Sequence, residues 1–169
     1  MTRLMALDIG DVRIGVALSD ATQFLASPYT TLHVSRDETQ TWNALQRLIE
    51  ESEATGLVIG LPISLDGQIH AQGKRIQTFV TRLQQHIDIP ITFWDERLST
   101  VEAERLLTQR GGELASGKQR EHRRRQGNSS GQRHTKRRRR NEQEIDALAA
   151  TVILQEYLDN QRSTTGENL

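Results

Sequence analysis

Residues 57–61 read Leu-Val-Ile-Gly-Leu, a short apolar run that ends at Pro62. A strand without polar positions is stable only when both of its faces are covered, so this run predicts a central strand in a sheet with helices on either side. Two further apolar runs, residues 4–7 and residues 14–18, are separated by a glycine-containing turn. Together they predict a hairpin at the start of the chain.

The next part of the chain alternates between extended and helical patterns. A third extended segment is expected within residues 24–34, where Pro28 marks an irregular or edge position. Apolar residues at helical spacing predict helices over residues 37–53 and residues 76–87. Residues 89–93 alternate between apolar and polar side chains and predict another strand.

Two capping patterns predict the remaining helices. Ser99 with Glu102 begins a helix that ends near Gln109, and Asn141 with Glu144 begins the last one. This order of elements favours the α/β class. We expect a five-stranded mixed sheet, antiparallel in its first three strands and followed by alternating helices and strands, with helices on both faces.

Positive charge is concentrated in one segment, although the 169-residue chain has a formal net charge of zero. Residues 110–140 hold twelve basic and two acidic side chains, and the remaining residues have an equal excess of acids. The segment has almost no large apolar residue, so it buries too little surface to offset its ordering entropy. We expect a single domain over residues 1–160 that contains a mobile basic loop over residues 111–140, followed by a polar tail over residues 161–169.

The absence of cysteine excludes thiol catalysis, cysteine-ligated zinc, iron–sulfur clusters and disulfides. This composition agrees with a reducing compartment. No apolar run approaches the roughly 20 residues of a membrane-spanning helix, and the first residues lack the apolar core of a signal peptide. We expect a cytoplasmic protein that does not contact a membrane.

Acidic residues follow the predicted strands, where ligands collect in α/β sheets. Asp8 ends the first apolar run, Glu96 follows the last strand, and Asp146 lies in the first turns of the last helix. Carboxylates gathered in a half-buried site repel one another unless a cation offsets the repulsion, and oxygen ligands suit Mg²⁺ or Mn²⁺. Two such ions roughly 4 Å apart can promote phosphodiester hydrolysis without a nucleophilic side chain.

Each acid also has an ordinary structural alternative. Asp8 could cap the turn that follows it, and Asp146 could compensate the dipole of its helix. Glu96 could pair on the surface with Arg97 or Arg105. Taken one at a time these alternatives are strong, and it is the joint arrangement of the three acids, together with the sequence around them, that favours a site.

Four blocks of the sequence resemble the motifs of a known protein family. They are LDIGDVRIGVALSD at residues 7–20, VIGLP at residues 58–62 with Asp66-Gly67, WDERLST at residues 94–100, and IDALAA at residues 145–150. In order and spacing they resemble the motif blocks of the YqgF family, also called RuvX. Its bacterial members are related to Holliday junction resolvases and are named as pre-16S rRNA nucleases.

The resemblance implies a ribonuclease-H-like fold with the first strand at its centre. By position, Asp8, Glu96 and Asp146 match the acids of the family, which implies that they are catalytic and bind a divalent metal, Mg²⁺ or Mn²⁺. Arg13 matches the arginine of the family's hairpin, and Arg97 flanks the second acid. Both arginines would contact substrate phosphates, with a surface ion pair as the alternative for Arg13.

The chain departs from the family pattern in two places. Asp11 and Val12 stand where many members have Thr-Lys, which removes a basic group beside the expected site. The basic link from Gly112 to Ile145 is also stretched to over thirty residues. We interpret its arginine clusters as phosphate-binding, with a solvated insertion of no function as the alternative. The arginines concerned are Arg123, Arg124, Arg125, Arg137, Arg138, Arg139 and Arg140.

We expect a metal-dependent endonuclease that acts on structured nucleic acid and processes the 5′ end of pre-16S rRNA. The alternatives are a Holliday-junction-type DNA resolvase and a non-catalytic RNA-binding factor of ribosome biogenesis. An actin-like ATPase or sugar kinase also opens with an Asp-x-Gly hairpin, but it needs two such domains and the chain is too short. The expected partner is nucleic acid, either pre-rRNA or branched DNA, and the expected state is a monomer or weak homodimer.

Overall fold

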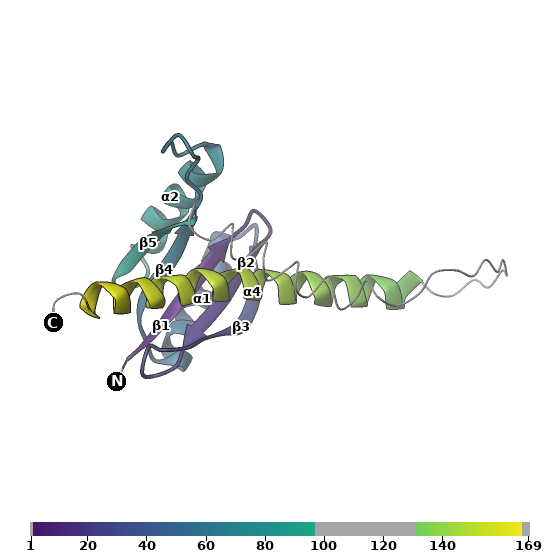
Figure 1. Ribbon diagram of the computed structural model, residues 1–169. Coiled ribbons are helices and arrows are strands. Elements are labelled where there is room, and N and C mark those ends of the chain that lie inside the picture. The colour runs from purple at the N-terminus through teal and green to yellow at the C-terminus, as the bar shows by residue number, and fades with distance from the viewer. Residues whose placement is uncertain (1, 97–130, 167–169) are drawn as a thin grey trace, which may run out of the picture.

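The computed structural model describes residues 2–96 and 131–166 (Figure 1). The helix expected over residues 99–109 lies outside the described residues, and so does the expected loop over residues 111–130. Across the two described ranges, no helix has both the length and the apolar character needed to cross a membrane.

Five strands form one mixed sheet in the order β3-β2-β1-β4-β5 (Figure 1). Its strands are β1 (Arg3–Ile9), β2 (Arg13–Ser19), β3 (Ala26–His33), β4 (Ala54–Leu61) and β5 (Ile91–Asp95). The pairs β1–β2 and β2–β3 are antiparallel, whereas β4 runs parallel to β1 and β5 runs parallel to β4. The predicted α/β class, the number of strands and the central first strand are confirmed.

Helices cover both faces of the sheet, as predicted. α1 (Glu38–Ser52) and α2 (Ala71–Leu83) pack on one face, and α4 (Gly131–Gly166) packs on the other. Figure 1 shows α4 lying across the strands and continuing beyond the sheet at its N-terminal end. α1 begins after Asp37, whose carboxylate accepts a hydrogen bond from the Thr39 N–H at 3.0 Å, so the predicted start of this helix is confirmed.

Alternation along the strands separates two hydrophobic cores. In β1, Met5 and Leu7 pack toward α1 and α2, whereas Leu4 and Ala6 pack toward α4. The core under α1 and α2 is built mainly from large side chains. The face under α4 carries several alanines and glycines, so this helix lies close to the strands.

Gly15 on β2 marks a close approach of α4 to the sheet. A Cβ atom at this position would overlap the backbone carbonyl oxygen of Asp146, so the strand and the helix meet backbone to backbone. Gly15 is also the register partner of Asp8 on β1. The glycine therefore sets the separation between Asp146 and the strand that carries Asp8.

Pro28 lies on β3, the edge strand, as predicted. The register between β2 and β3 shifts at this point: Val16 pairs with Thr30, and Ala17 pairs with Pro28. Tyr29 is the extra residue between them. A proline lacks the N–H that a regular ladder uses, so an edge position with irregular pairing accommodates it.

The two ends of α4 differ from the expected ends of the last helix. It begins at Gly131, so residues 131–140 are helical and do not belong to a loop that ends before Asn141. It also extends to Gly166, so most of the expected polar tail is helical. The expectation was wrong because a scarcity of apolar residues predicts poor burial, not poor helix formation. Arginine, lysine, glutamine and glutamate are good helix formers, and no proline or glycine lies between the two ends of α4.

We expect Gly15→Ala to destabilise the fold. The added methyl group would collide with the backbone of α4, and overpacking of this kind lowers the free energy of unfolding by about 1–3 kcal/mol. In a domain of this size each kcal/mol lowers Tm by about 2–4 °C, which thermal unfolding measures. Gly56→Ala is the matched control, because its Cβ would meet the flexible end of the Leu4 side chain at 3.0 Å. Equal melting temperatures for the two variants would contradict the close approach of α4.

Candidate functional site

The three predicted acids lie on the α4 side of the sheet. Asp8 comes two residues after Ala6 in β1, so its side chain points toward α4 as that of Ala6 does. Glu96 comes two residues after Trp94, which packs in the same core. Asp146 lies on α4 itself. The fold thus gathers acids from the ends of two strands and from the helix that crosses them.

Burial and repulsion from neighbouring carboxylates both act on Asp8 and Glu96. Burial, with a smaller contribution from the Asp146 carboxylate, raises the pKa of Asp8 to about 6. Burial also raises the pKa of Glu96 to about 7, and repulsion from Asp8 adds to this effect. Asp95 and Glu156 contribute weaker repulsions to the pKa of Glu96. Asp8 is therefore close enough to both other acids for their charges to interact.

Arg13 at the start of β2 ties α4 to the hairpin. Its Nε donates to Asp146 Oδ2 at 2.5 Å, and its Nη1 donates to Glu142 Oε2 at 3.2 Å. These contacts raise the pKa of Arg13, chiefly through the hydrogen bond to Asp146. The arginine expected to hold a phosphate thus engages two carboxylates of α4, and an ion pair was the alternative expected for it.

Glu142 was not predicted as part of the site. It lies one helical turn before Asp146, and both side chains reach the same guanidinium. The i, i+4 spacing of two acids on one helix was the available signal in the sequence, because residues at this spacing share a face. Arg13 therefore bridges two acids of α4 and holds this part of the helix against β2.

Gly60 on β4 was also not predicted. A Cβ atom there would overlap Glu96 Oε1 and would lie 2.6 Å from Ile153 Cδ1. The carboxylate of Glu96 therefore occupies the space that a side chain at position 60 would fill. A glycine inside an otherwise apolar strand was the signal, since it often marks a close approach of another group.

Trp94 and Tyr157 join the end of β5 to α4. Trp94 Nε1 donates to Glu156 Oε2 at 3.3 Å. The indole also meets the Tyr157 ring edge-on, with 5.8 Å between the ring centroids. α4 is thus fixed over β2 by the Arg13 contact to Asp146 and over β5 by the contacts of Trp94.

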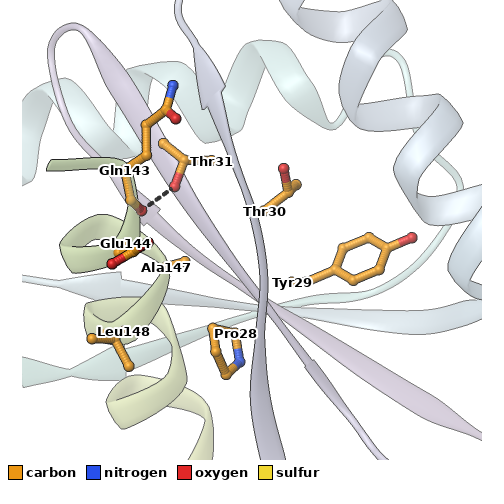
Figure 2. A pocket seen from close by; sticks show the side chains of 8 residues that line it. All are labelled: Pro28, Tyr29, Thr30, Thr31, Gln143, Glu144, Ala147 and Leu148. Carbon is orange, nitrogen blue, oxygen red and sulfur yellow. Dashed lines mark hydrogen bonds between the residues drawn. The ribbon is translucent and has the colours of Figure 1, made fainter. Parts of the chain in front are cut away.

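A groove of about 490 Å³ lies between β3 and α4 (Figure 2). It is lined from β3 by residues 28–31 and from α4 by Gln143, Glu144, Ala147 and Leu148. The Thr31 hydroxyl donates to the Gln143 carbonyl oxygen at 2.6 Å, which anchors the helix to the edge strand. None of the three predicted acids lines the groove, so it is distinct from the candidate site.

Oxygen donors gather at the candidate site without forming a closed metal cage. Within residues 2–96 and 131–166, no three acidic or histidine side chains are grouped closely enough to hold a metal ion as they stand. One carboxylate oxygen of Asp146 is engaged by Arg13. The raised pKa values of Asp8 and Glu96 mean that a positive charge near them would be stabilising.

Apart from Arg13, the arginines expected to bind phosphate fall into two groups. The last cluster lies on the N-terminal part of α4, which continues into Asp146, and consists of Arg137, Arg138, Arg139 and Arg140. The others, Arg97, Arg123, Arg124 and Arg125, lie outside the part of the chain that the structure describes.

Comparison with known sequences finds a family and bacterial relatives whose similarity covers most of this chain. A sequence profile of the RuvX family, described as Holliday junction resolvase, matches residues 2–126. A protein of Roseiflexus sp. (strain RS-1), named "Putative pre-16S rRNA nuclease", is 42% identical over 163 residues, which cover 95% of this chain and 96% of that protein. A protein of the same name from Thermoanaerobacter pseudethanolicus (strain ATCC 33223 / 39E) is 35% identical over 161 residues, with coverages of 95% and 99%.

A solved structure shares the fold. T. thermophilus RuvC in complex with Holliday junction substrate superimposes with a TM-score of 0.52 and 10% sequence identity, covering 97% of this chain and 98% of that chain. At this identity the likeness concerns the fold alone. It confirms the expected ribonuclease-H-like architecture.

We expect Asp8→Asn to stabilise the metal-free protein at pH 8. Because the pKa of Asp8 is raised to about 6 in the folded state, its ionised form opposes folding above that pH, and the amide removes the penalty. The free energy of unfolding should rise by on the order of 1 kcal/mol at pH 8. This gain should disappear as the pH falls through about 6 toward the ordinary value of 3.8, which urea unfolding in EDTA measures.

Asp20→Asn is the control, because it should change the free energy of unfolding in the opposite direction. Asp20 accepts hydrogen bonds from the Thr22 hydroxyl and from the backbone N–H groups of Leu25 and Phe24, and these bonds lower its pKa. Its ionised form stabilises the fold above its ordinary value of 3.8, so this variant should be less stable at pH 8. The difference should vanish as the pH falls through the lowered pKa. An Asp8→Asn protein that is destabilised at pH 8 would contradict the crowding of acids at the site.

Proposed function

The chain belongs to the RuvX family, and on this premise we propose that it is a metal-dependent nuclease that hydrolyses phosphodiester bonds of pre-16S rRNA. The observation that carries the proposal is the gathering of Asp8, Glu96 and Asp146 on the α4 side of the sheet, where the charge of Asp8 interacts with those of the other two acids. The shared name of the two bacterial relatives supports the substrate.

The three acids fit a hard divalent cation such as Mg²⁺ or Mn²⁺. Their donor atoms are carboxylate oxygens, which are the ligands that these ions prefer. Burial and repulsion raise the pKa values of Asp8 and Glu96, so a cation held between the acids would offset the penalty of keeping them ionised. When bound, such an ion supplies stabilisation for the negative charge that develops on the phosphate oxygens.

Each acid is positioned by a different part of the fold. Asp8 lies on the central strand, between β2 and β4, which restricts its movement. Glu96 lies over Gly60, and Asp146 is held by Arg13. In this proposal the three acids bind the cation. Arg13 orients Asp146 and adds positive charge close to the substrate phosphate.

Nucleic acid is the proposed partner, because the basic segment carries the charge that a phosphate backbone attracts. Residues 136–140, one lysine and four arginines, lie on the same helix as Asp146. They would draw a polyanion toward acids that would otherwise repel it, together with Arg97 and residues 123–125. We propose that residues 1–160 act as one domain in the cytoplasm, as a monomer or weak homodimer, with this segment as part of the substrate surface.

A DNA junction resolvase is the second candidate, which the description of the matched family favours. Resolution of a four-way junction requires two active sites and therefore a symmetric dimer. Processing of a single RNA strand requires one site. The oligomeric state in solution therefore helps to separate the two candidates.

We expect the purified chain to cleave an RNA that spans the 5′ end of 16S rRNA when Mg²⁺ or Mn²⁺ is present. Asp8→Asn should lower the cleavage rate by at least about 100-fold, because it removes a ligand of the cation. Glu50→Gln changes an exposed acid of α1, on the opposite face of the sheet, and should retain activity. Gel analysis of the RNA products, beside a four-way DNA junction, measures the outcome.

The possible results separate the candidates. Equal activity of Asp8→Asn and the unaltered chain would contradict the proposed site. Cleavage of the junction but not of the RNA would favour the resolvase. Binding of the RNA with no cleavage under either metal would indicate a non-catalytic RNA-binding factor.

We expect glutamine substitution of Arg137, Arg138, Arg139 and Arg140 together to flatten the salt dependence of RNA binding. Each phosphate contact that is lost reduces the slope of log K against log salt concentration by about 0.7–0.9. Fluorescence anisotropy at several KCl concentrations measures this slope. Arg47→Gln, an exposed arginine on α1, should leave it unchanged. An unchanged slope in the fourfold variant would mean that this part of α4 does not contact the RNA backbone.

A further inference from the structure

A small cavity lies beside the turn that joins β1 to β2, on the face of the sheet that α2 covers. Its volume is about 170 Å³. Cavities that bind drug-sized ligands measure roughly 300–1,000 Å³, so this one suits a single flat ring system. Its apolar wall is formed by Ile9, Val34, Ile76 and Phe79, and Asp11 and Arg75 stand at its rim.

The apolar wall is held in place by the core. Ile9 and Ile76 are 7% and 4% exposed. The Phe79 ring packs against Trp42 with 4.7 Å between the ring centroids. Because these side chains are already ordered, a ligand that enters the cavity loses little free energy to ordering its wall.

Opposite charges stand side by side at the rim. Arg75 Nη1 lies 3.4 Å from Asp11 Oδ1, and the two side chains are 63% and 72% exposed. An ion pair as exposed as this one contributes little to stability. It does present a carboxylate acceptor and guanidinium donors together at the mouth of an apolar cavity.

The cavity and the acid site lie on opposite sides of the same strand end. Ile9 follows Asp8 in β1, so the two side chains point to opposite faces of the sheet. Asp11 comes three residues after Asp8, in the turn that leads into β2. A substrate strand that enters the cavity from the acid site would pass over the turn between β1 and β2, where Asp11 lies.

We propose that this cavity binds an unpaired base of the substrate strand and that Asp11 and Arg75 select guanine. A base has apolar faces, which suit the wall beside Phe79, and a polar edge, which needs partners at the rim. Among the four RNA bases, only guanine carries two adjacent N–H donors for a carboxylate with a carbonyl oxygen next to them for a guanidinium. The inference rests on the proposed function, because it takes the ligand to be part of a nucleic acid.

Titration of the metal-free, full-length protein with GMP tests this proposal when it is followed by NMR of the isoleucine and valine methyl groups. The signals of Ile9, Val34 and Ile76 should shift. AMP, CMP and UMP should bind at least about fivefold more weakly, because they lack the paired donors. Ribose 5-phosphate, which carries the phosphate without a base, should leave these signals unchanged.

Two variants test the selection and the cavity separately. Asp11→Asn leaves the core untouched and should abolish the preference for GMP over AMP. Asp88→Asn removes an exposed acid before β5, at the other end of the parallel strands, and should keep the preference. Val34→Phe fills the cavity and should abolish the shifts of Ile9 and Ile76. If that variant does not fold, Asp11→Asn still decides the question.

GMP that shifts no signal of the cavity wall, or four nucleotides that bind equally well, would overturn the proposal. A response to ribose 5-phosphate as large as that to GMP would assign the binding to phosphate and would also overturn it. These outcomes are independent of cleavage. GMP binding without RNA cleavage would contradict the proposed nuclease activity and support base binding in the cavity. Cleavage without GMP binding would contradict only base binding in the cavity.

Discussion

Close packing of α4 on the sheet is the constraint on which the candidate site depends. Gly15 lets the backbone of α4 touch β2 at Asp146, and Gly60 leaves space on β4 for the Glu96 carboxylate. Larger side chains at these two positions would lift the helix and move the acids apart. The Arg13 guanidinium then fixes Asp146 against the hairpin. The geometry of the acids therefore depends on two contacts at glycine and on the ion pair of Arg13 with Asp146.

This packing brings like charges together at the expense of stability. Asp8 and Glu96 resist ionisation because they are buried close to other carboxylates. A cation that relieves this repulsion is bound more favourably than it would be by the same acids spread over a solvated surface. The basic part of α4 carries the opposite charge and suits a polyanionic substrate. The zero net charge of the chain thus conceals an acidic body and a basic segment.

The elements of the fold and the places of Asp8, Glu96 and Asp146 on them could be predicted, because alternation and helical spacing depend directly on burial. The catalytic role of the three acids stays a prediction. The apolar run at residues 57–61 predicted an interior strand, and the position of Asp8 after such a run predicted its place at a strand end. Long-range contacts could not be predicted in this way: Arg13 and Glu142 are 129 positions apart and meet only because α4 crosses β2. The helical state of residues 131–140 was also hidden, because their composition indicates exposure and leaves the backbone conformation open.

Carboxyl-carbon NMR over a range of pH tests most directly whether Asp8, Glu96 and Asp146 act together on a cation. Without metal, we expect a pKa of about 6 for Asp8 and about 7 for Glu96, because both are buried among other acids. Saturating Mg²⁺ should lower both pKa values, since a bound cation favours the ionised forms. Values near the ordinary 3.8 and 4.5 that Mg²⁺ does not change would contradict the proposed metal site.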